Sequence, residues 1–198
     1  MTDTVTSTKR TFHALVAAGV IVTFAVACSD FTGVPASLAT LTDSGTVFAL
    51  NGAPASAPTA LHLYTGSRLA ADASFLFDIA FDIDAGGNPV ILPLRTVASG
   101  LAGAHTVALQ NINQDFSTLE KAPKSGYRAD TALVTRVGQT IAIQSLDVNL
   151  CGFSVTGSSI YAKLVILSMN PIARTMSIQY TVDPNCGFVS FLPGIPKD

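Results

Sequence analysis

The sequence predicts an all-β fold, an antiparallel β-sandwich of the immunoglobulin-like or a related type, preceded by one N-terminal apolar helix. Three observations favour it. About nine short segments have strand-like patterns, turns rich in Gly, Pro, Asn and Asp separate them, and no long amphipathic helical pattern follows residue 28. A small barrel is the alternative for the same pattern. The chain has 198 residues, of which 48% are apolar, so it is long enough for one domain of this kind.

The first element is the uncharged, mostly apolar run 11–28, which follows Lys9 and Arg10. A basic start, an apolar stretch and small residues at its end are typical of a secretory signal. Because Lys9 and Arg10 favour the cytoplasmic side, we expect the chain after the run to lie outside the cytoplasm. If the run is not cleaved, residues 12–27 are short for a membrane span, which needs about 20 residues, although about 17 can serve as a single transmembrane anchor.

The end of the run, Ala25-Val26-Ala27-Cys28, resembles the lipobox of bacterial lipoproteins. The resemblance covers the N-terminal segment only, and it implies cleavage before Cys28 and lipidation of that cysteine. The alternatives are a lipoprotein, a retained transmembrane anchor and a freely secreted protein. In the first two, residues 29–45 are a tether, and residues 46–198 are an extracytoplasmic domain on the periplasmic side of the bacterial cell envelope.

Residues 75–83 form the clearest strand. Every second residue in it is large and apolar: Phe75, Phe77, Ile79, Phe81 and Ile83. A period of two places these five side chains on one face of a sheet. Asp78 and Asp82 alternate with them, so we expect both on a solvated face. The Gly-rich segment 84–88 is a predicted turn.

Residues 90–97 are the predicted return strand. Pro93 lies within it and cannot donate a hydrogen bond to a neighbouring strand, which predicts an edge strand or a bulge there. Three shorter strands are predicted at residues 46–50, 61–65 and 105–110. Segment 116–119 has the pattern of one helical turn, and 127–137 with 140–147 is predicted to form a hairpin.

The last strong pattern is the hairpin 160–182, with its turn at Asn170-Pro171. Residues 161–169 are apolar on both faces, as in a central strand. Cys151 and Cys186 flank this hairpin, so we expect them at the same end of the fold. Export permits a disulfide between them, with two free buried thiols as the alternative. Both cysteines begin a Cys-Gly-Phe segment, which suggests two similar turns.

Composition excludes several functional classes. Charged residues make up 12% of the chain, the net charge is −2, and no basic run occurs, so neither nucleic-acid binding nor a polybasic membrane patch is predicted. The sequence has no nucleophile elbow, no covalent haem motif and no phosphate-binding Gly loop. We therefore predict no enzymatic activity, no catalytic residue and no cofactor.

Metal binding has one weak candidate, a calcium loop that uses Asp82, Asp84 and Asn88. Pro93 stands where such a loop needs an acid, so we predict no metal site beyond this candidate. His62 and His105 have no ligand at metal spacing. A triad from His105, an Asp and a Ser stays open, because triads assemble in space rather than in sequence.

A tether, a compact disulfide-bonded domain and no catalytic motif together predict a non-catalytic structural or interaction subunit that docks on a membrane or envelope complex. An electron-transfer or light-harvesting assembly is one setting that fits. The alternative is a lipoprotein that binds a small ligand or carbohydrate through the sandwich loops. A hydrolase with an unrecognised site is the third hypothesis.

Overall fold

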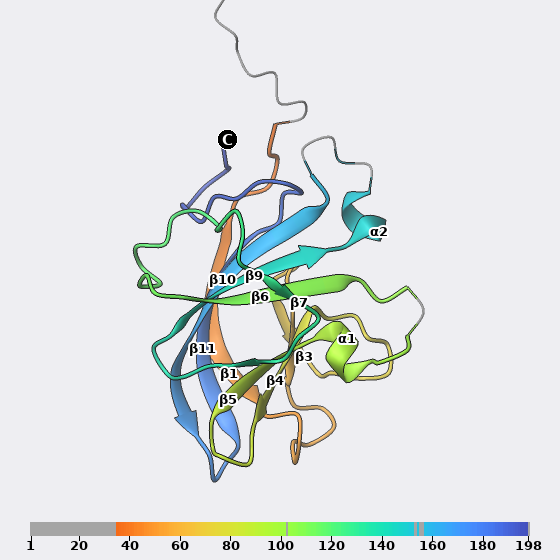
Figure 1. Ribbon diagram of the computed structural model, residues 1–198, viewed down its shortest axis with the longest axis vertical. Coiled ribbons are helices and arrows are strands. Elements are labelled where there is room, and N and C mark those ends of the chain that lie inside the picture. The colour runs from red at the N-terminus through yellow and green to blue at the C-terminus, as the bar shows by residue number, and fades with distance from the viewer. Residues whose placement is uncertain (1–34, 102, 153, 155–156, 198) are drawn as a thin grey trace, which may run out of the picture. The chain divides into compact units, whose positions relative to one another are not determined.

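The computed structural model describes residues 35–197, except 102, 153 and 155–156. These residues belong to one compact unit, Thr32–Asp198, and they form two antiparallel sheets. The prediction of an all-β sandwich is thereby confirmed. The predicted N-terminal apolar helix and Cys28 lie outside the described residues. The start and the C-terminal end of the described chain lie at the same end of the sandwich (Figure 1).

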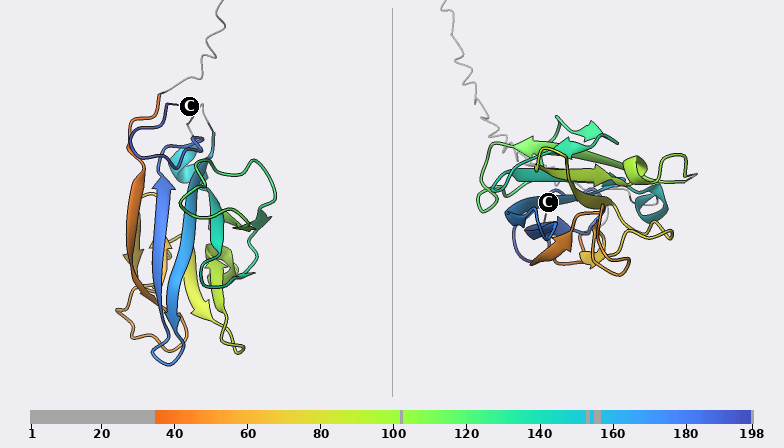
Figure 2. Two further views of the ribbon diagram at one scale, coloured as in Figure 1. Left: turned by 90° about the vertical axis from the view of Figure 1, so that its left-hand side faces the viewer. Right: turned by 90° about the horizontal axis from the view of Figure 1, so that it is seen from below.

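The described strands of the first sheet run in the order β1 (Leu41–Phe48), β11 (Thr175–Asp183), β10 (Ser159–Asn170), β9 (Thr140–Leu146), β6 (Thr106–Ile112) and β7 (Arg128–Ala129). Those of the second sheet run in the order β3 (Ser67–Leu69), β2 (Ala60–His62), β4 (Ile79–Ile83), β5 (Pro89–Pro93) and β8 (Leu133–Val134). Two one-turn helices, α1 (Leu94–Val97) and α2 (Val148–Cys151), follow β5 and β9. Figure 2 shows β1 beside β11 and β10 in the first sheet.

The main core lies between the sheets. Strand β10 contributes Ala162, Leu164 and Ile166 to it, and β4 contributes Phe81 and Ile83 from the opposite sheet. These side chains are buried because the period of two in each strand directs one face inward. The predicted central strand within 161–169 and the hairpin 160–182 are both present as β10 and β11.

One side of the sandwich is closed by contacts between β1, β11 and the β2–β3 turn. The Tyr180 hydroxyl donates to the carbonyl of Gly66 at 2.6 Å, and Asp43 pairs with Arg68 at 3.4 Å. Gly45 makes this approach possible, because a Cβ there would lie 1.9 Å from the Arg68 guanidinium. Arg68 therefore packs over Gly45, whereas Leu41 to Ser44 at the start of β1 stay exposed.

At the other side the chain crosses from one sheet to the other. β7 pairs with β6, β8 pairs with β5, and Asp130 lies between β7 and β8 with φ at 46°. The Asp130 amide donates to the carbonyl of Val107 at 2.8 Å, which holds the crossing in place. The predicted hairpin between 127–137 and 140–147 is therefore wrong, since those segments pair with other strands.

The predicted strand 75–83 is shorter than expected. It begins at Ile79, and Phe75 has φ at 50°, outside strand conformation. Phe77 packs with Ala80 and Leu94 in a second cluster on the outer face of the second sheet, beneath α1. The expectation that all five apolar residues share one face is therefore wrong for Phe75 and Phe77.

Pro93 is the last residue of β5, and the segment after it forms α1 instead of continuing the predicted strand 90–97. It pairs with Ile79 of β4, whereas β8 pairs with Val90 and Ile91 only. The missing amide of Pro93 therefore removes no bond to β8. β5 is next to an edge strand of two residues, not itself the edge.

A loop over the outer face of the first sheet packs against a third apolar cluster, which contains Leu119 and Phe191. Lys163 of β10 points into it and is only 6% exposed. Its ammonium donates to the carbonyls of Phe116 at 2.7 Å and Leu119 at 2.9 Å, and it lies 4.5 Å from the Phe116 ring centroid. The predicted turn at 116–119 is present, and Lys163 holds it to the sheet.

The sandwich begins earlier than predicted. β1 starts at Leu41, inside the segment 29–45 that the sequence assigns to a tether. Before it, the amides of Ser37 and Leu38 both donate to the Asn185 side-chain oxygen at 3.0 Å. Residues 37–45 are therefore part of the domain, because their backbone groups bond to it.

Candidate functional site

The candidate site is centred on Asp78, the residue immediately before β4. Its amide donates to the carbonyl of Leu61 in β2 at 3.0 Å, and its carbonyl accepts from the amide of Leu94 in α1 at 2.9 Å. These two bonds hold its backbone between a strand and a helix. The side chain is then directed between the two sheets, where the residue is only 4% exposed.

The Asp78 carboxylate joins the two sheets. One oxygen accepts from the amide of Leu63 at 2.6 Å, and the other accepts from the Ser145 hydroxyl and lies 2.9 Å from His105 Nε2. Ser145 is directed inward because it shares a face of β9 with the core residues Ile141 and Ile143. The expectation that Asp78 lies on a solvated face is wrong, because donors from the opposite sheet compensate its burial.

Burial alone would raise the pKa of Asp78, but the hydrogen bonds and charge of His105, with the donors Ser145 and Leu63, lower it overall. Burial would likewise lower the pKa of His105, yet its hydrogen bond and attraction to Asp78 raise it overall. Each group thus favours the charged form of the other. When His105 is protonated, the pair is an imidazolium–carboxylate bridge between the two sheets.

These pKa directions determine how the pair changes stability with pH. Because the folded-state pKa of His105 is raised, its pairing with Asp78 stabilises the fold fully below the ordinary pKa of 6.5. This contribution is lost as the pH rises through the folded-state pKa of His105. Because the folded-state pKa of Asp78 is lowered, its charged carboxylate stabilises the fold above the ordinary pKa of 3.8. This contribution is lost as the pH falls through the folded-state pKa of Asp78. The pair therefore contributes most between these two ordinary values.

We expect His105→Gln to lose more stability near about pH 5.5 than near about pH 8.5, because only the wild type loses charge pairing across that interval. Urea unfolding followed by circular dichroism at both pH values measures the difference. His62→Gln is the matched control, since His62 bonds to Thr65 at the surface, away from Asp78. An equal loss at both pH values for His105→Gln would contradict the assignment.

Ser145, Asp78 and His105 are brought together, but not in the order that nucleophilic catalysis requires. In a hydrolase triad the histidine lies between the serine and the carboxylate and accepts the serine proton. Here Asp78 lies between the other two, and Ser145 donates to the carboxylate. Ser145 is also only 1% exposed. This geometry supports a structural link between the sheets.

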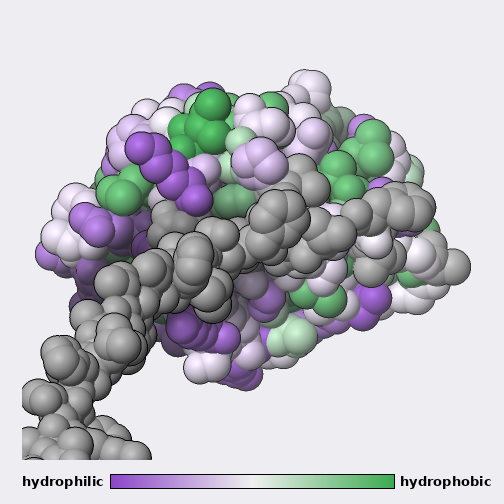
Figure 3. Space-filling view, turned by 90° about the horizontal axis from the view of Figure 1, so that it is seen from above, coloured by the Kyte–Doolittle hydropathy of each residue, from purple (hydrophilic) through white to green (hydrophobic). Residues whose placement is uncertain are grey.

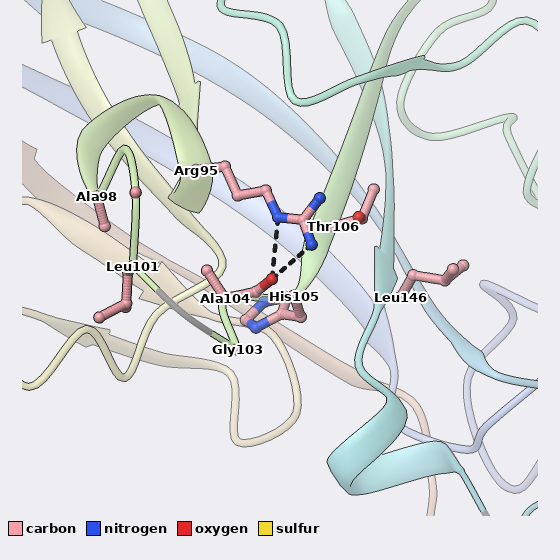
Figure 4. A pocket seen from close by; sticks show the side chains of 9 residues that line it. Arg95, Ala98, Leu101, Gly103, Ala104, His105, Thr106 and Leu146 are labelled. Atoms are coloured by element: carbon pink, nitrogen blue, oxygen red, sulfur yellow. Dashed lines mark hydrogen bonds between the residues drawn. The ribbon is translucent and has the colours of Figure 1, made fainter.

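His105 also lines a surface pocket of about 420 Å³, together with Arg95 of α1, Leu146 and the loop after α1 (Figure 4). Arg95 is held by the carbonyl of Ala104, which accepts from Nε at 2.9 Å and from Nη2 at 2.7 Å. Its Nη1 pairs with Asp130 at 3.0 Å. The pocket therefore offers a small polar ligand the Arg95 guanidinium and the His105 ring, each already paired with an aspartate.

A second pocket of about 200 Å³ lies at the end of the sandwich where the described chain starts. It is lined by the uncharged residues Pro35, Ala36, Ser37, Leu38, Tyr64, Leu150, Ser154, Pro184, Asn185, Cys186 and Phe188. Among the described residues that line it, none has a charged side chain. The sequence does not reveal this pocket, because its residues come from four separate segments.

The residues of the calcium candidate have other partners. Asp82 accepts from Arg174 Nη2 at 2.7 Å and from the Asn51 side chain. Asp84 accepts from the Asn88 amide at 2.8 Å within the β4–β5 turn. Within the described part of the chain, no group of three or more His, Cys, Asp or Glu side chains is arranged to hold a metal ion. These contacts lend the calcium prediction no support.

The predicted disulfide is present. The sulfur atoms of Cys151 and Cys186 are 2.01 Å apart and the Cα atoms 5.6 Å apart, at one end of the β10–β11 hairpin. Cys151 ends α2, where the Asp147 side chain accepts from the Asn149 amide at 2.9 Å. Cys186 instead lies in a turn after β11. The two cysteines therefore do not lie in similar turns, contrary to expectation.

Among residues 35–197, as far as they are described, no helix has the length and hydropathy of a membrane span. The possible membrane span 12–27 and the lipidation candidate Cys28 fall outside that part of the chain. Comparisons with protein-family models, curated proteins and solved structures give no match.

Proposed function

We propose that this chain is an exported bacterial envelope protein, anchored to a membrane by its N-terminal segment. Its sandwich, of the immunoglobulin-like or a related type, serves as a non-catalytic structural or interaction subunit on a membrane complex. The observation that carries the proposal is the Cys151–Cys186 disulfide. Such bonds persist mainly in oxidising compartments outside the cytoplasm, which agrees with the export pattern of residues 9–28.

The non-catalytic part of the proposal rests on how the polar network is used. The Asp78 carboxylate binds the buried Ser145 hydroxyl and the Leu63 amide, and its remaining partner is His105. A carboxylate with this set of donors connects strands and holds a fold together. An electron-transfer or light-harvesting complex is one setting that the proposal allows.

The test is purification of the full chain from its source membrane in mild detergent, with mass spectrometry of the proteins that accompany it. We expect stoichiometric partners from one membrane complex. A chain that purifies alone contradicts the subunit proposal. A Cys28→Ser variant separates the two anchors, because only a lipoprotein loses both its lipid mass and its cleavage when Cys28 is replaced.

A second function has a specific observation in its favour. The pocket beside Arg95 and His105, about 420 Å³ in volume, is within the usual range for small-molecule sites. A lipoprotein that binds a small ligand or carbohydrate there is the alternative. Titration with small carboxylates and oligosaccharides, followed by NMR shifts of Gly100 and Gly103, tests it. Arg95→Gln should abolish any shifts that arise from ligand binding in this pocket.

A further inference from the structure

Exposed apolar side chains gather at the end of the sandwich where the described chain begins. We call this the tether-end surface and define it by five residues: Tyr64 (39% exposed), Leu38 (41%), Leu150 (37%), Leu192 (47%) and Ile195 (55%). Leu38, Tyr64 and Leu150 line the uncharged pocket described above. Large apolar side chains that remain exposed together indicate a surface that another phase or molecule covers.

Hydrogen bonds connect the N-terminal part of this surface, at Leu38, to its C-terminal part, at Leu192 and Ile195. The Asn185 side chain donates to the carbonyl of Leu38 at 2.8 Å, so the first described segment is fixed beside the turn after β11. Thr40 donates through its hydroxyl to the carbonyl of Leu192 at 2.7 Å and through its amide to that of Gly194 at 2.9 Å. Leu38, Leu192 and Ile195 are thereby held at one end of the domain.

Figure 3 looks onto this end of the molecule. Hydrophobic side chains (green) lie in several groups across it, among pale, weakly polar ones and hydrophilic ones (purple). An interfacial surface has this mixed character, because its apolar side chains enter the outer part of a bilayer while its polar groups stay among the lipid headgroups.

The segment between Cys28 and the described residues is short, and its length limits how far the tether-end surface can lie from the membrane. Seven residues, 29–35, connect Cys28 to the domain. Fully extended, they span at most about 25 Å. With the anchoring proposed above, Cys28 lies at the membrane surface, whether it carries lipid or ends a transmembrane span. Pro35 therefore stays within that distance of the bilayer, and the tether-end surface starts only three residues later.

We propose that the tether-end surface rests on the lipid bilayer and inserts Leu38, Leu150, Leu192 and Ile195 into its interface, with Tyr64 at headgroup level. The proposal rests on the membrane anchoring proposed above. A short tether raises the effective concentration of this surface at the bilayer, so a contact too weak to recruit a free domain suffices. Since none of these residues is basic, zwitterionic lipid supports the contact as well as anionic lipid.

The opposite end of the sandwich provides the control. It carries the β10–β11 turn with Ile172, which is 96% exposed, and the Asp82–Arg174 ion pair at 2.7 Å. Figure 1 shows this turn at the opposite end of the sandwich from the start of the described chain. A domain that rests on the tether-end surface keeps Ile172 in water, although Ile172 is the more exposed side chain.

The experiment exploits the absence of tryptophan from the chain. Full-length Leu192→Trp, Ile195→Trp and Ile172→Trp variants are reconstituted into phosphatidylcholine vesicles with brominated acyl chains. We expect the brominated lipid to quench roughly half of the Leu192→Trp and Ile195→Trp fluorescence and little of that of Ile172→Trp. Two reporters at the tether end keep the test valid if circular dichroism shows that one variant does not fold.

Vesicle flotation of the same samples separates the two proposals. If the chain floats and the tether-end reporters are as unquenched as Ile172→Trp, the bilayer contact is refuted and the anchor stands; a protein partner is then the occupant to consider. Equal quenching of all three reporters also refutes it, because the contact is then not specific to this end. If the chain does not float, the anchor fails and the contact fails with it.

Discussion

Asp78→Ala is expected to destabilise the domain by about 3–5 kcal/mol, the usual cost of removing one partner from a buried ion pair. The substitution leaves the Ser145 hydroxyl and the Leu63 amide without their acceptor, and His105 without its counter-charge. For a domain of this size the melting temperature should fall by roughly 10 °C or more. Thermal and urea unfolding followed by circular dichroism measure both quantities.

Asp84→Ala is the matched control for this prediction. Asp84 is also a hydrogen-bonded aspartate near β4, but it lies in a solvent-exposed turn, where it accepts from Asn88. Its removal should therefore change stability much less. If both variants unfold at the same urea concentration, the network around Asp78 does not stabilise the sandwich as we describe.

Loss of the Cys151–Cys186 disulfide is expected to destabilise the domain by about 4 kcal/mol in the chain-entropy model, because the bridge closes a loop of roughly 36 residues in the unfolded chain. The two residues are separated by 35 positions. A Cys151→Ala/Cys186→Ala double variant should show this loss in urea unfolding. Reduction of the wild type under conditions that open the bridge should lower its stability to the level of the variant.

Alkylation tests the bridge itself. In oxidised protein purified from the envelope and denatured without reductant, Cys151 and Cys186 should remain unlabelled, and both should be labelled after reduction. Labelling of both before reduction would show that the cysteines are free thiols. It would also remove the observation on which the proposed export rests.

Local patterns predicted those elements whose partners follow closely in sequence. The alternation in Met176–Val182 and the apolar middle of 161–169 predicted β11 and β10, and these two strands pair across a short turn. Their flanking positions placed Cys151 and Cys186 at the same end, which the disulfide confirms. In each case the information needed lies within a few tens of residues.

Patterns failed where the partner lies far away in the chain. Residues 127–137 look like half of a hairpin, but Arg128–Ala129 and Leu133–Val134 pair with different sheets, because Asp130 turns the chain across the side of the sandwich. A period of two says which residues share a face and does not say which strand lies beside them. Pairing is decided by the packing of the whole domain.

Strand periodicity and the position of two cysteines about one hairpin were enough to predict an all-β domain and a Cys151–Cys186 bridge, and the folded domain confirms both. No local pattern could predict that Asp78 is buried and paired with His105, 27 residues away, and Ser145, 67 residues away. A carboxylate is stable out of water only where donors converge on it. That convergence is a property of the folded chain, since the donors come from three separate segments.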